Sequence, residues 1–218
     1  QDHKRLNEND KGPNTGGMGA YSPAPLLSDD YLERIINEII EPTINELNKE
    51  SIVYRGVIYF GLMITQSGPK VIEYNCRFGD PECQTIMPLV DQNFVFLLEK
   101  CAMGNLTGDE KINTSENVSG CVIATSKGYP NEYKTGLPIN IGKIDSYNCQ
   151  IFDSGTSLNE NGELLTDGGR VLSIVCQDKD FDTVFEKAYK NLKEINFKGM
   201  YFRNDIGYQV RKNFSKEN

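Results

Sequence analysis

The sequence predicts an α+β fold in which antiparallel strands and a few helices occupy separate stretches of the chain. Three patterns lead to this fold class. Apolar runs at 57–65 and 70–75 flank a Gln-Ser-Gly-Pro turn sequence and predict a hairpin. Residues 28–47 and 181–195 carry apolar side chains at helical spacing. Between them, residues 119–176 contain short apolar runs separated by glycines, which indicates strands joined by turns.

The predicted helices have recognisable ends. Ser28 is suited to the N-cap of the first helix, and the two aspartates that follow it favour the positive end of the helix dipole. Pro42 is expected to kink or interrupt this helix. A second helix is expected from about 93 to 103, ending near Gly104. Asp80 and Pro81 have the character of an N-cap and first residue, and they predict a further short helix.

A polar stretch after residue 104 predicts a domain boundary, and the expected domains are residues 1–113 and 118–218. The second domain is expected to consist of short strands around one helix. These strands are predicted at 119–125, 139–144, 150–152, 170–176 and 200–208, and the helix at 181–195.

Composition excludes several classes of function. The chain has 218 residues and a net charge of −8, which disfavours duplex nucleic acid as a partner because phosphate backbones bind basic surfaces. No apolar run approaches the length of a membrane span, so no membrane partner is expected. Six cysteines occur without a C-x-x-C pair, which predicts reduced thiols in a cytoplasmic protein rather than disulfides or a zinc site.

A glycine-rich segment near the start of the chain is the first candidate binding element. Residues 12–23 contain four glycines and two prolines, which disfavours a helix or a central strand. Backbone N–H groups without neighbouring side chains can line a pocket for an anion, so the stretch 12–19 is a candidate binding element. A long surface turn explains the same composition equally well.

The residues before this segment are polar and charged. Asp2 could hold an amine, and Lys4 and Arg5 could contact phosphate. His3 is the only histidine, so any Ser–His or Cys–His mechanism would require it. Without further support, a polar segment that leads into the glycines is the favoured explanation of these residues.

The end of the predicted hairpin carries the most informative pattern. Side chains alternate along a strand, so Glu73 and Asn75 share a face and lie about 7 Å apart. A carboxylate and a carboxamide oxygen are suitable ligands for Mg²⁺. Arg77 follows with planar donors suited to phosphate. Together they predict work on a phosphorylated nucleotide, although the polar face of an exposed hairpin would show the same Glu-x-Asn spacing.

Five further charged residues have structural explanations. Arg170 follows two glycines at the start of a strand, where it could face a phosphate or point into solvent from a hairpin tip. Arg203 and Asp205 are expected to form a structural pair. Asp80 and Glu82 are expected to stabilise the start of the short helix rather than bind metal.

Six motifs then identify a family resemblance that extends over nearly the whole chain. The sequence is similar to the glycinamide ribonucleotide synthetase family, also called phosphoribosylamine–glycine ligase, and resembles its C-terminal half. The motifs occur in the family's order at residues 1–5, 12–25, 73–84, 126–130, 168–172 and 203–208. Gly-Pro-Asn-Thr-Gly-Gly-Met-Gly and Glu-Tyr-Asn-Cys-Arg-Phe-Gly-Asp-Pro-Glu are the most specific of them.

The resemblance implies the C-terminal part of an ATP-grasp domain, mostly antiparallel sheet with helices, followed by a small C-terminal α+β domain. It implies ligation of glycine to 5-phosphoribosylamine in purine biosynthesis, with ATP as co-substrate and Mg²⁺ or Mn²⁺ as cofactor. Glu73 and Asn75 would hold metal and nucleotide, and Arg77 would be catalytic. The implied substrate-binding residues are Asp2, Lys4, Asn14, Gly16, Gly17, Met18 and Arg170. Animal-type members are often fused to two later purine enzymes.

Three departures from the family pattern leave alternatives open. The strand before Glu73 lacks the second acid that many ATP-grasp enzymes carry, and Gly61 stands near that place. Asp153 stands where the family often has histidine. The family's N-terminal half is not part of this sequence, so the chain alone is expected to be inactive. A non-catalytic ATP-grasp scaffold, or a ligase for another carboxylate, remains an alternative.

Overall fold

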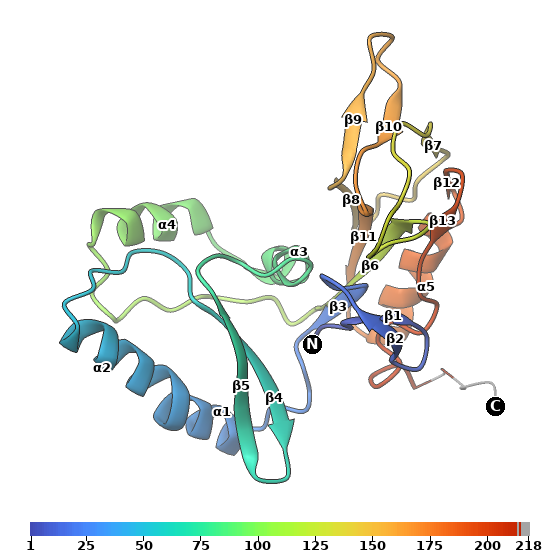
Figure 1. Ribbon diagram of the computed structural model, residues 1–218. Coiled ribbons are helices and arrows are strands. Elements are labelled where there is room, and N and C mark those ends of the chain that lie inside the picture. The colour runs from blue at the N-terminus through green and yellow to red at the C-terminus, as the bar shows by residue number, and fades with distance from the viewer. Residues whose placement is uncertain (213, 215–218) are drawn as a thin grey trace. The chain divides into compact units, whose positions relative to one another are not determined.

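The computed structural model describes residues 1–212 and 214 (Figure 1). The described chain divides into two compact units. Unit 1 contains residues 1–23, 80–89 and the chain from Thr114 onward, and unit 2 contains Ala24–Gly79 and Val90–Asn113. The units therefore interleave along the sequence, and the expected domain boundary between 113 and 118 stays a prediction.

Unit 1 is built on a five-stranded antiparallel sheet. Its central strand β6 (Val118–Ser126) pairs on one side with β11 (Arg170–Asp178), which in turn pairs with β8 (Cys149–Asp153). The other side of β6 pairs with β3 (Gly19–Ser22) and β13 (Met200–Tyr201). Strands from both ends of the chain thus meet on β6.

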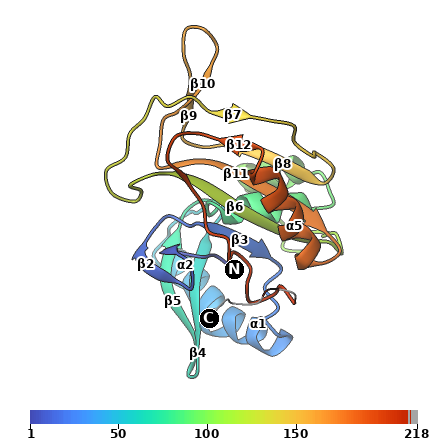
Figure 2. The ribbon, with the colours of Figure 1, turned by 90° about the vertical axis from the view of Figure 1, so that its right-hand side faces the viewer.

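Helix α5 (Phe181–Leu192) packs against β6 and β11 and forms the core of unit 1 with them (Figure 2). Its N-cap is Asp180, whose carboxylate accepts a hydrogen bond from the Thr183 N–H at 2.9 Å. Glycine in the sheet allows the close approach, because a Cβ at Gly120 would lie 2.8 Å from the Phe185 ring. Phe185 is fully buried as a result.

Short elements complete unit 1. One helical stretch leads into a 3₁₀ turn, and the remaining strands form three small antiparallel pairs. They are α3 (Glu82–Ile86), Met87–Leu89, β1 (Arg5–Asn7) with β2 (Lys11–Asn14), β9 (Thr156–Leu158) with β10 (Leu164–Thr166), and β7 (Asn140–Ile141) with β12 (Ile195–Asn196).

Unit 2 contains the predicted hairpin and three helices. The hairpin is β4 (Tyr59–Thr65) with β5 (Gly68–Asn75), and the helices are α1 (Asp29–Ile35), α2 (Glu41–Lys49) and α4 (Phe94–Met103). A π-helical turn at Ile36–Ile40 joins α1 to α2 directly before Pro42, where the missing proline N–H interrupts the helical hydrogen bonding.

The predicted helix ends of unit 2 are confirmed. Ser28 Oγ accepts a hydrogen bond from the Tyr31 N–H, and Asn93 caps α4 in the same way through the Phe96 N–H. Gly104 ends α4 in the left-handed conformation, with φ +73°. No helix in the described part of the chain is both long and apolar enough to cross a membrane.

The structure corrects several predictions in unit 1. Residues 19–22 form β3, although the glycine-rich composition seemed to exclude a central strand. This strand lies between β6 and a bridge from Asp2 to Ala20, and Ala20 is fully buried. Gly19 is what makes the pairing possible, because a Cβ there would lie 2.5 Å from the Cys121 carbonyl oxygen. The predicted last strand is also shorter than expected, since it ends at Tyr201.

The cysteine and cap predictions are wrong at two places. Cys149 and Cys176 face each other on paired strands and form a disulfide, with Cα atoms 4.1 Å apart. Their separation of 27 residues gave no sequence signal of this pairing. Asp80 does not cap α3, because Pro81 holds the N-cap position and makes no side-chain cap. The Asp80 carboxylate instead accepts a hydrogen bond from Gln84 at 2.8 Å.

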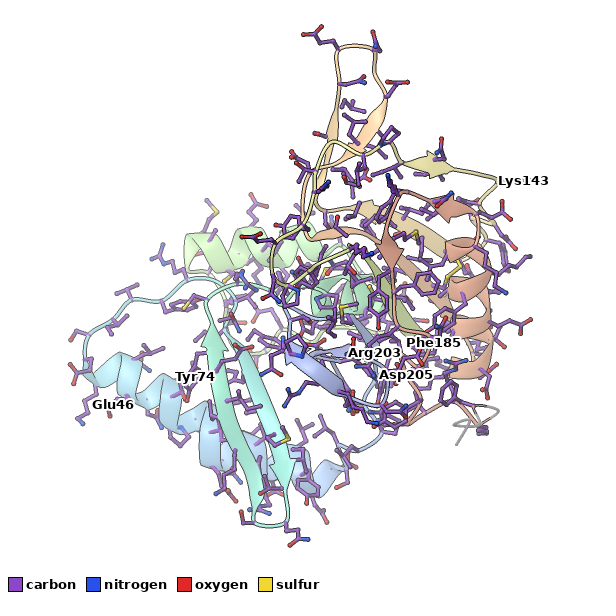
Figure 3. The ribbon with its side chains drawn as sticks, turned by 45° about the vertical axis from the view of Figure 1, so that its right-hand side comes forward. Glu46, Tyr74, Lys143, Phe185, Arg203 and Asp205 are labelled. Carbon is purple, nitrogen blue, oxygen red and sulfur yellow. A yellow bond between two sulfur atoms is a disulfide. The ribbon has the colours of Figure 1, made fainter. Side chains whose placement is uncertain are left out.

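A buried ion pair fixes the C-terminal loop of unit 1 (Figure 3). Arg203 is fully buried and donates from Nε and Nη2 to the two carboxylate oxygens of Asp205, at 2.7 and 2.8 Å. Its Nη1 donates to the Arg5 carbonyl oxygen at 2.9 Å and lies 3.0 Å from Asp10. The predicted structural pair is therefore confirmed, and it attaches the loop to the N-terminal strands.

Arg203→Ala is expected to lower the free energy of unfolding by about 3–5 kcal/mol, because it leaves Asp205 buried without its partner. Arg34→Ala serves as the control, since Arg34 pairs with Glu38 on an exposed helix face, where solvent screens the pair and its loss should change stability little. Urea unfolding followed by circular dichroism measures both. A loss at Arg203 no larger than at Arg34 would contradict the assignment.

Candidate functional site

The predicted site residues fall into two groups, and each group belongs to one unit. Unit 2 contains Glu73, Asn75 and Arg77. Unit 1 contains Asp2, Lys4, Asn14, Gly16, Gly17, Met18 and Arg170. Each group has its own geometry and electrostatics.

In unit 2, the end of β5 presents Glu73 and Asn75 on one face. Glu73 lies opposite Gly61, and Asn75 lies opposite Tyr59. A bulge at Ile72 precedes them, since the register moves from Leu62 opposite Val71 to Gly61 opposite Glu73. Beyond the bulge the alternation is regular, so the two side chains share a face as the sequence predicted.

The cross-strand glycine makes room for the Glu73 side chain. A Cβ at Gly61 would lie 2.7 Å from Glu73 Cγ and 3.4 Å from Oε1. The carboxylate of Glu73 and the carboxamide of Asn75 are hard oxygen donors and fit a divalent cation. No cluster of three or more His, Cys, Asp or Glu side chains suited to a metal occurs among the described residues. A cation held here would therefore take its other ligands from phosphate or water.

Arg77 lies directly after this strand and is exposed. Its Nη1 donates a hydrogen bond to the Phe78 carbonyl oxygen at 2.7 Å. This bond occupies one of its five N–H donors and leaves a guanidinium that can bind an anionic group through two parallel hydrogen bonds. The chemistry available in unit 2 is thus two metal-binding oxygens followed by one cation.

In unit 1, Asp2 and Glu82 place two nearly buried carboxylates around the Lys4 ammonium. Lys4 Nζ lies 2.6 Å from Asp2 Oδ2 and 3.9 Å from Glu82 Oε1. Burial raises the pKa of Asp2 to about 6, because loss of hydration outweighs the attraction of Lys4, and the Glu82 carboxylate raises it further. Two acids around one ammonium therefore favour retention of a proton on Asp2.

The amides of the glycine-rich loop are occupied by the protein itself. The Gly16 N–H donates to Tyr129 Oη at 2.9 Å, the Gly17 N–H to Thr15 Oγ1 at 3.0 Å, and the Met18 N–H to the His3 carbonyl oxygen at 2.9 Å. The expectation that these amides offer an anion pocket is therefore wrong for this arrangement. The assignment of Gly16, Gly17 and Met18 as substrate-binding residues stays a prediction.

Close packing explains why glycine is needed at position 17. Its φ is +124°, and a Cβ there would lie 2.5 Å from Pro81 Cδ and 2.9 Å from Asp2 Oδ1. Asn14, in contrast, lies exposed at the end of β2 opposite Arg5. The loop thus brings the N-terminal segment against the start of α3.

Arg170 neither faces solvent from a hairpin tip nor presents an unpaired charge. Its Nη1 donates to the carbonyl oxygens of Gly16 and Asp80, at 3.1 and 2.7 Å. Its Nη2 pairs with the Asp80 carboxylate at 3.0 Å. A contact between Arg170 and a substrate phosphate remains a prediction. The hydrogen bonds described for Arg170 all go to protein atoms.

His3 is buried, so the interpretation of residues 2–5 as a simple polar segment is wrong at this position. Its Nε2 accepts a hydrogen bond from the Gly207 N–H at 3.2 Å. Burial lowers the pKa of His3 to about 4, and the charge of Arg203 contributes to this shift. His3 is therefore uncharged at neutral pH and joins the N-terminal segment to the C-terminal loop.

Sequence reasoning missed Tyr129 and undervalued two acidic residues. Tyr129 contacts Gly16 across 113 residues of chain, and no spacing rule predicts such a pair. Asp80 and Glu82 were expected only to stabilise a helix start, although Asp80 binds Arg170 and Glu82 lies near Lys4. The signal was the concentration of charge in the segment 77–82, which a single short helix does not require.

Comparison with known proteins gives two matches to one family. Residues 1–83 match the ATP-grasp (A) domain of phosphoribosylglycinamide synthetase, and residues 119–209 match its C domain. A phosphoribosylamine–glycine ligase from Synechocystis is 43% identical over 96% of this chain and 50% of its own length. The human trifunctional purine biosynthetic protein adenosine-3 is 40% identical over 96% of this chain and 21% of its own length.

Solved structures agree with these matches. A phosphoribosylamine–glycine ligase from Thermotoga maritima superposes with a TM-score of 0.84 at 32% identity, over 94% of this chain and 50% of that one. A biotin carboxylase domain from Hydrogenobacter thermophilus reaches 0.60 at 12% identity, over 92% of this chain and 42% of that one, and shares the fold alone. The predicted α+β, ATP-grasp fold is confirmed. The chain spans about half the length of its single-function relatives.

Gly17→Ala is expected to destabilise the protein by about 1–3 kcal/mol beyond the cost of its positive φ, because the new methyl group meets Pro81 and Asp2. Gly136→Ala is the matched control: its φ is +73° and a Cβ there meets no atom within 4 Å, so only the backbone cost of about 1–2 kcal/mol applies. Thermal and urea unfolding compare the two. Equal losses would show that the packing against Pro81 is unimportant.

Asp2→Asn is expected to change the pH dependence of stability. Between its ordinary pKa of 3.8 and the raised pKa of about 6, Asp2 binds its proton more tightly in the folded protein. The resulting stabilisation is complete below the lower value and is lost as pH rises through the upper one. Wild type should therefore lose stability relative to the variant from pH 4 to 7, as measured by urea unfolding at each pH. A constant offset for Asp2→Asn would refute the raised pKa.

Proposed function

Because this chain belongs to the phosphoribosylglycinamide synthetase family, we propose that the full-length protein ligates glycine to 5-phosphoribosylamine with cleavage of ATP. The products are glycinamide ribonucleotide, ADP and phosphate. The observation that carries this proposal is that Glu73 and Asn75 lie on the same face of β5. Glu73 lies opposite Gly61, and Arg77 follows the strand. Because the relatives are about twice as long, this activity belongs to the whole protein.

The reaction needs an activated carboxylate, because an amine does not displace oxide from glycine at a useful rate. A glycine carboxylate oxygen attacks the γ-phosphorus of ATP: a new oxygen–phosphorus bond forms, the bond from this phosphorus to the bridging β-phosphate oxygen breaks, and glycyl phosphate and ADP result. The amine of phosphoribosylamine then attacks the acyl carbon, which forms the amide, releases inorganic phosphate and gives up one proton. Phosphoryl transfer of this kind depends on positioning and charge neutralisation more than on covalent help from the protein.

Glu73 and Asn75 would hold a divalent cation, Mg²⁺ or Mn²⁺, through a carboxylate and a carboxamide oxygen. Such a cation neutralises charge on the ATP phosphates. Arg77 would stabilise negative charge on the transferred phosphoryl group and orient it by its planar donors. The space opposite Glu73 at Gly61 supports this assignment, because any side chain there would displace the carboxylate.

The unit 1 residues are proposed to position the substrates. Asp2 and Lys4 offer opposite charges to an amine and to an anion, and exposed Asn14 offers a carboxamide. Gly16 is exposed and would contact substrate beside its occupied amide, whereas Gly17 and Met18 are buried and would support the loop that carries it. Arg170 would act near the sugar phosphate by holding this loop in place, because its guanidinium is bound to Gly16 and Asp80.

Other features of the full protein are also proposals. A cytoplasmic location suits a soluble pathway of small phosphorylated metabolites, and fusion to later purine enzymes is the arrangement named for the trifunctional relatives. Residues 1–218 alone are expected to bind ATP weakly and not to turn over. Glycine-dependent ADP release separates this ligase from an ATP-grasp ligase for another carboxylate and from a non-catalytic scaffold.

Glu73→Gln in the full-length protein is expected to lower kcat at least about 100-fold, because even partners outside the ligand shell contribute 10–100-fold at metal sites. A coupled assay of ADP release with glycine and phosphoribosylamine measures the loss, and circular dichroism checks the fold. Glu99→Gln is the control, since Glu99 is exposed on α4 of the same unit. Near-normal turnover of Glu73→Gln would remove the metal assignment, and no ADP release by wild type would remove the ligase.

A further inference from the structure

We propose that Tyr129, Arg170 and Asp80 form a clamp that fixes the glycine-rich loop at Gly16. In this arrangement Arg170 is a positioning residue, and it does not supply charge to a substrate phosphate. The clamp itself stands on the contacts within unit 1. Only its effect on catalysis rests on the proposed function.

Both backbone polar groups of Gly16 are held by side chains from distant parts of the chain. Its N–H donates to Tyr129 Oη at 2.9 Å, and its carbonyl oxygen accepts from Arg170 Nη1 at 3.1 Å. A Cβ at this position would lie 3.1 Å from Arg170 Cζ and 3.2 Å from Tyr129 Oη. Gly16 is therefore gripped from two sides at a distance that no other residue type permits without a shift.

The charge of Arg170 is already matched by the protein. Its Nη2 pairs with the Asp80 carboxylate at 3.0 Å, while Nη1 also donates to the Asp80 carbonyl oxygen at 2.7 Å. Gln84 Nε2 donates to the other carboxylate oxygen at 2.8 Å and so fixes the orientation of Asp80. A paired guanidinium attracts phosphate less strongly than a free one, because the neighbouring carboxylate repels the same anion.

The turn that carries Arg170 is itself anchored to the loop that carries Tyr129. Ser126 donates from its N–H to the Gly169 carbonyl oxygen at 2.8 Å and from Oγ to the Gly168 carbonyl oxygen at 2.9 Å. A Cβ at Gly169 would lie 2.3 Å from the Tyr129 ring. The turn that carries Arg170 and the loop that carries Tyr129 are therefore joined to each other by direct contacts.

This arrangement has a physical purpose in a glycine-rich segment. Glycine loses more conformational freedom on ordering than any other residue, so such a loop does not hold one geometry by itself. The clamp joins Gly16 to Asp80, and the next residue, Gly17, packs against Pro81. A loop fixed in this way can present the residues next to Gly16 to substrate without reorganisation. Even a small misplacement of such residues lowers the catalytic rate.

Hydrogen exchange on the full-length protein tests the clamp without any assay of activity. Tyr129→Phe should raise exchange at the amides of residues 16–18 about fivefold or more, because one hydrogen bond is removed. Tyr133→Phe is the matched control, since its hydroxyl forms no hydrogen bond among the described residues and it lies in the same loop. Unchanged exchange in Tyr129→Phe would overturn the clamp, whatever the enzyme activity.

Two substitutions of Arg170 separate positioning from phosphate binding. Arg170→Lys keeps the charge but cannot span Gly16 and Asp80, whereas Arg170→Gln keeps hydrogen-bond donors without the charge. The clamp predicts similar losses in kcat, about 10-fold or more, with affinity for glycinamide ribonucleotide in calorimetry changed less than threefold. Much better retention by lysine, together with a tenfold or greater loss of affinity in Arg170→Gln, would overturn the proposal.

A double-mutant cycle completes the test. Asp80→Asn and Arg170→Gln remove the same contact, so the double variant should lose little more kcat than Arg170→Gln alone. Independent roles would make the two losses multiply, which contradicts the clamp. Because the cycle needs measurable turnover in wild type, failure of the proposed ligase appears there first and leaves the hydrogen-exchange result to decide the clamp.

Discussion

The pairing of β3 with β6 is the constraint on which the rest of unit 1 depends. It places residues 19–22 beside residues 119–122, and it carries the N-terminal segment into the sheet of the C-terminal residues. His3, buried Arg203 and Asp205 then join this segment to the C-terminal loop. The charged residues at positions 2 and 4 therefore have fixed places only because an otherwise glycine-rich stretch forms a strand.

Buried and half-buried charge is arranged differently at the two ends of this segment. At Arg203 the guanidinium donates two hydrogen bonds to Asp205 and lies 3.0 Å from Asp10, so this group of charges acts as a structural joint. Around Lys4, two carboxylates share one ammonium, and the pKa of Asp2 rises to about 6 through burial. A carboxyl group with a raised pKa beside a loop is expected where an amine or a proton is handled.

Local patterns in the sequence were sufficient for unit 2, whereas in unit 1 they predicted β6, β8, β11 and α5 but not how the chain's distant segments pair. The caps at Ser28 and Gly104, the hairpin and the shared face of Glu73 and Asn75 depend on neighbours within a few residues, so spacing rules could predict them. The bulge at Ile72 was not foreseen, yet it leaves the alternation beyond it unchanged. The resemblance to a known family supplied the fold name and the roles, which spacing alone did not.

Unit 1 depends on contacts between residues that lie 27 to 154 positions apart in the sequence, and these contacts carry no local signal. The sequence around Gly19 is typical of a loop, and only its pairing with β6 makes it part of a strand. Cys149 lies opposite Cys176 because of the register between β8 and β11. Arg170 had two local interpretations, and its actual partners, Gly16 and Asp80, lie 154 and 90 residues away. Tertiary pairing, rather than propensity, decided each of these positions.

The central claim is that Glu73 and Asn75 together hold the cation that accompanies ATP. A crystal structure of the full-length protein with Mn²⁺ and a non-hydrolysable ATP analogue tests it most directly, because anomalous scattering locates the manganese independently of the protein model. The account predicts a manganese peak bonded to Glu73 and Asn75 side-chain oxygens at about 2.0–2.2 Å, the range for small divalent cations and oxygen ligands, with a phosphate oxygen in the same shell. A manganese peak that both side chains fail to reach would contradict it.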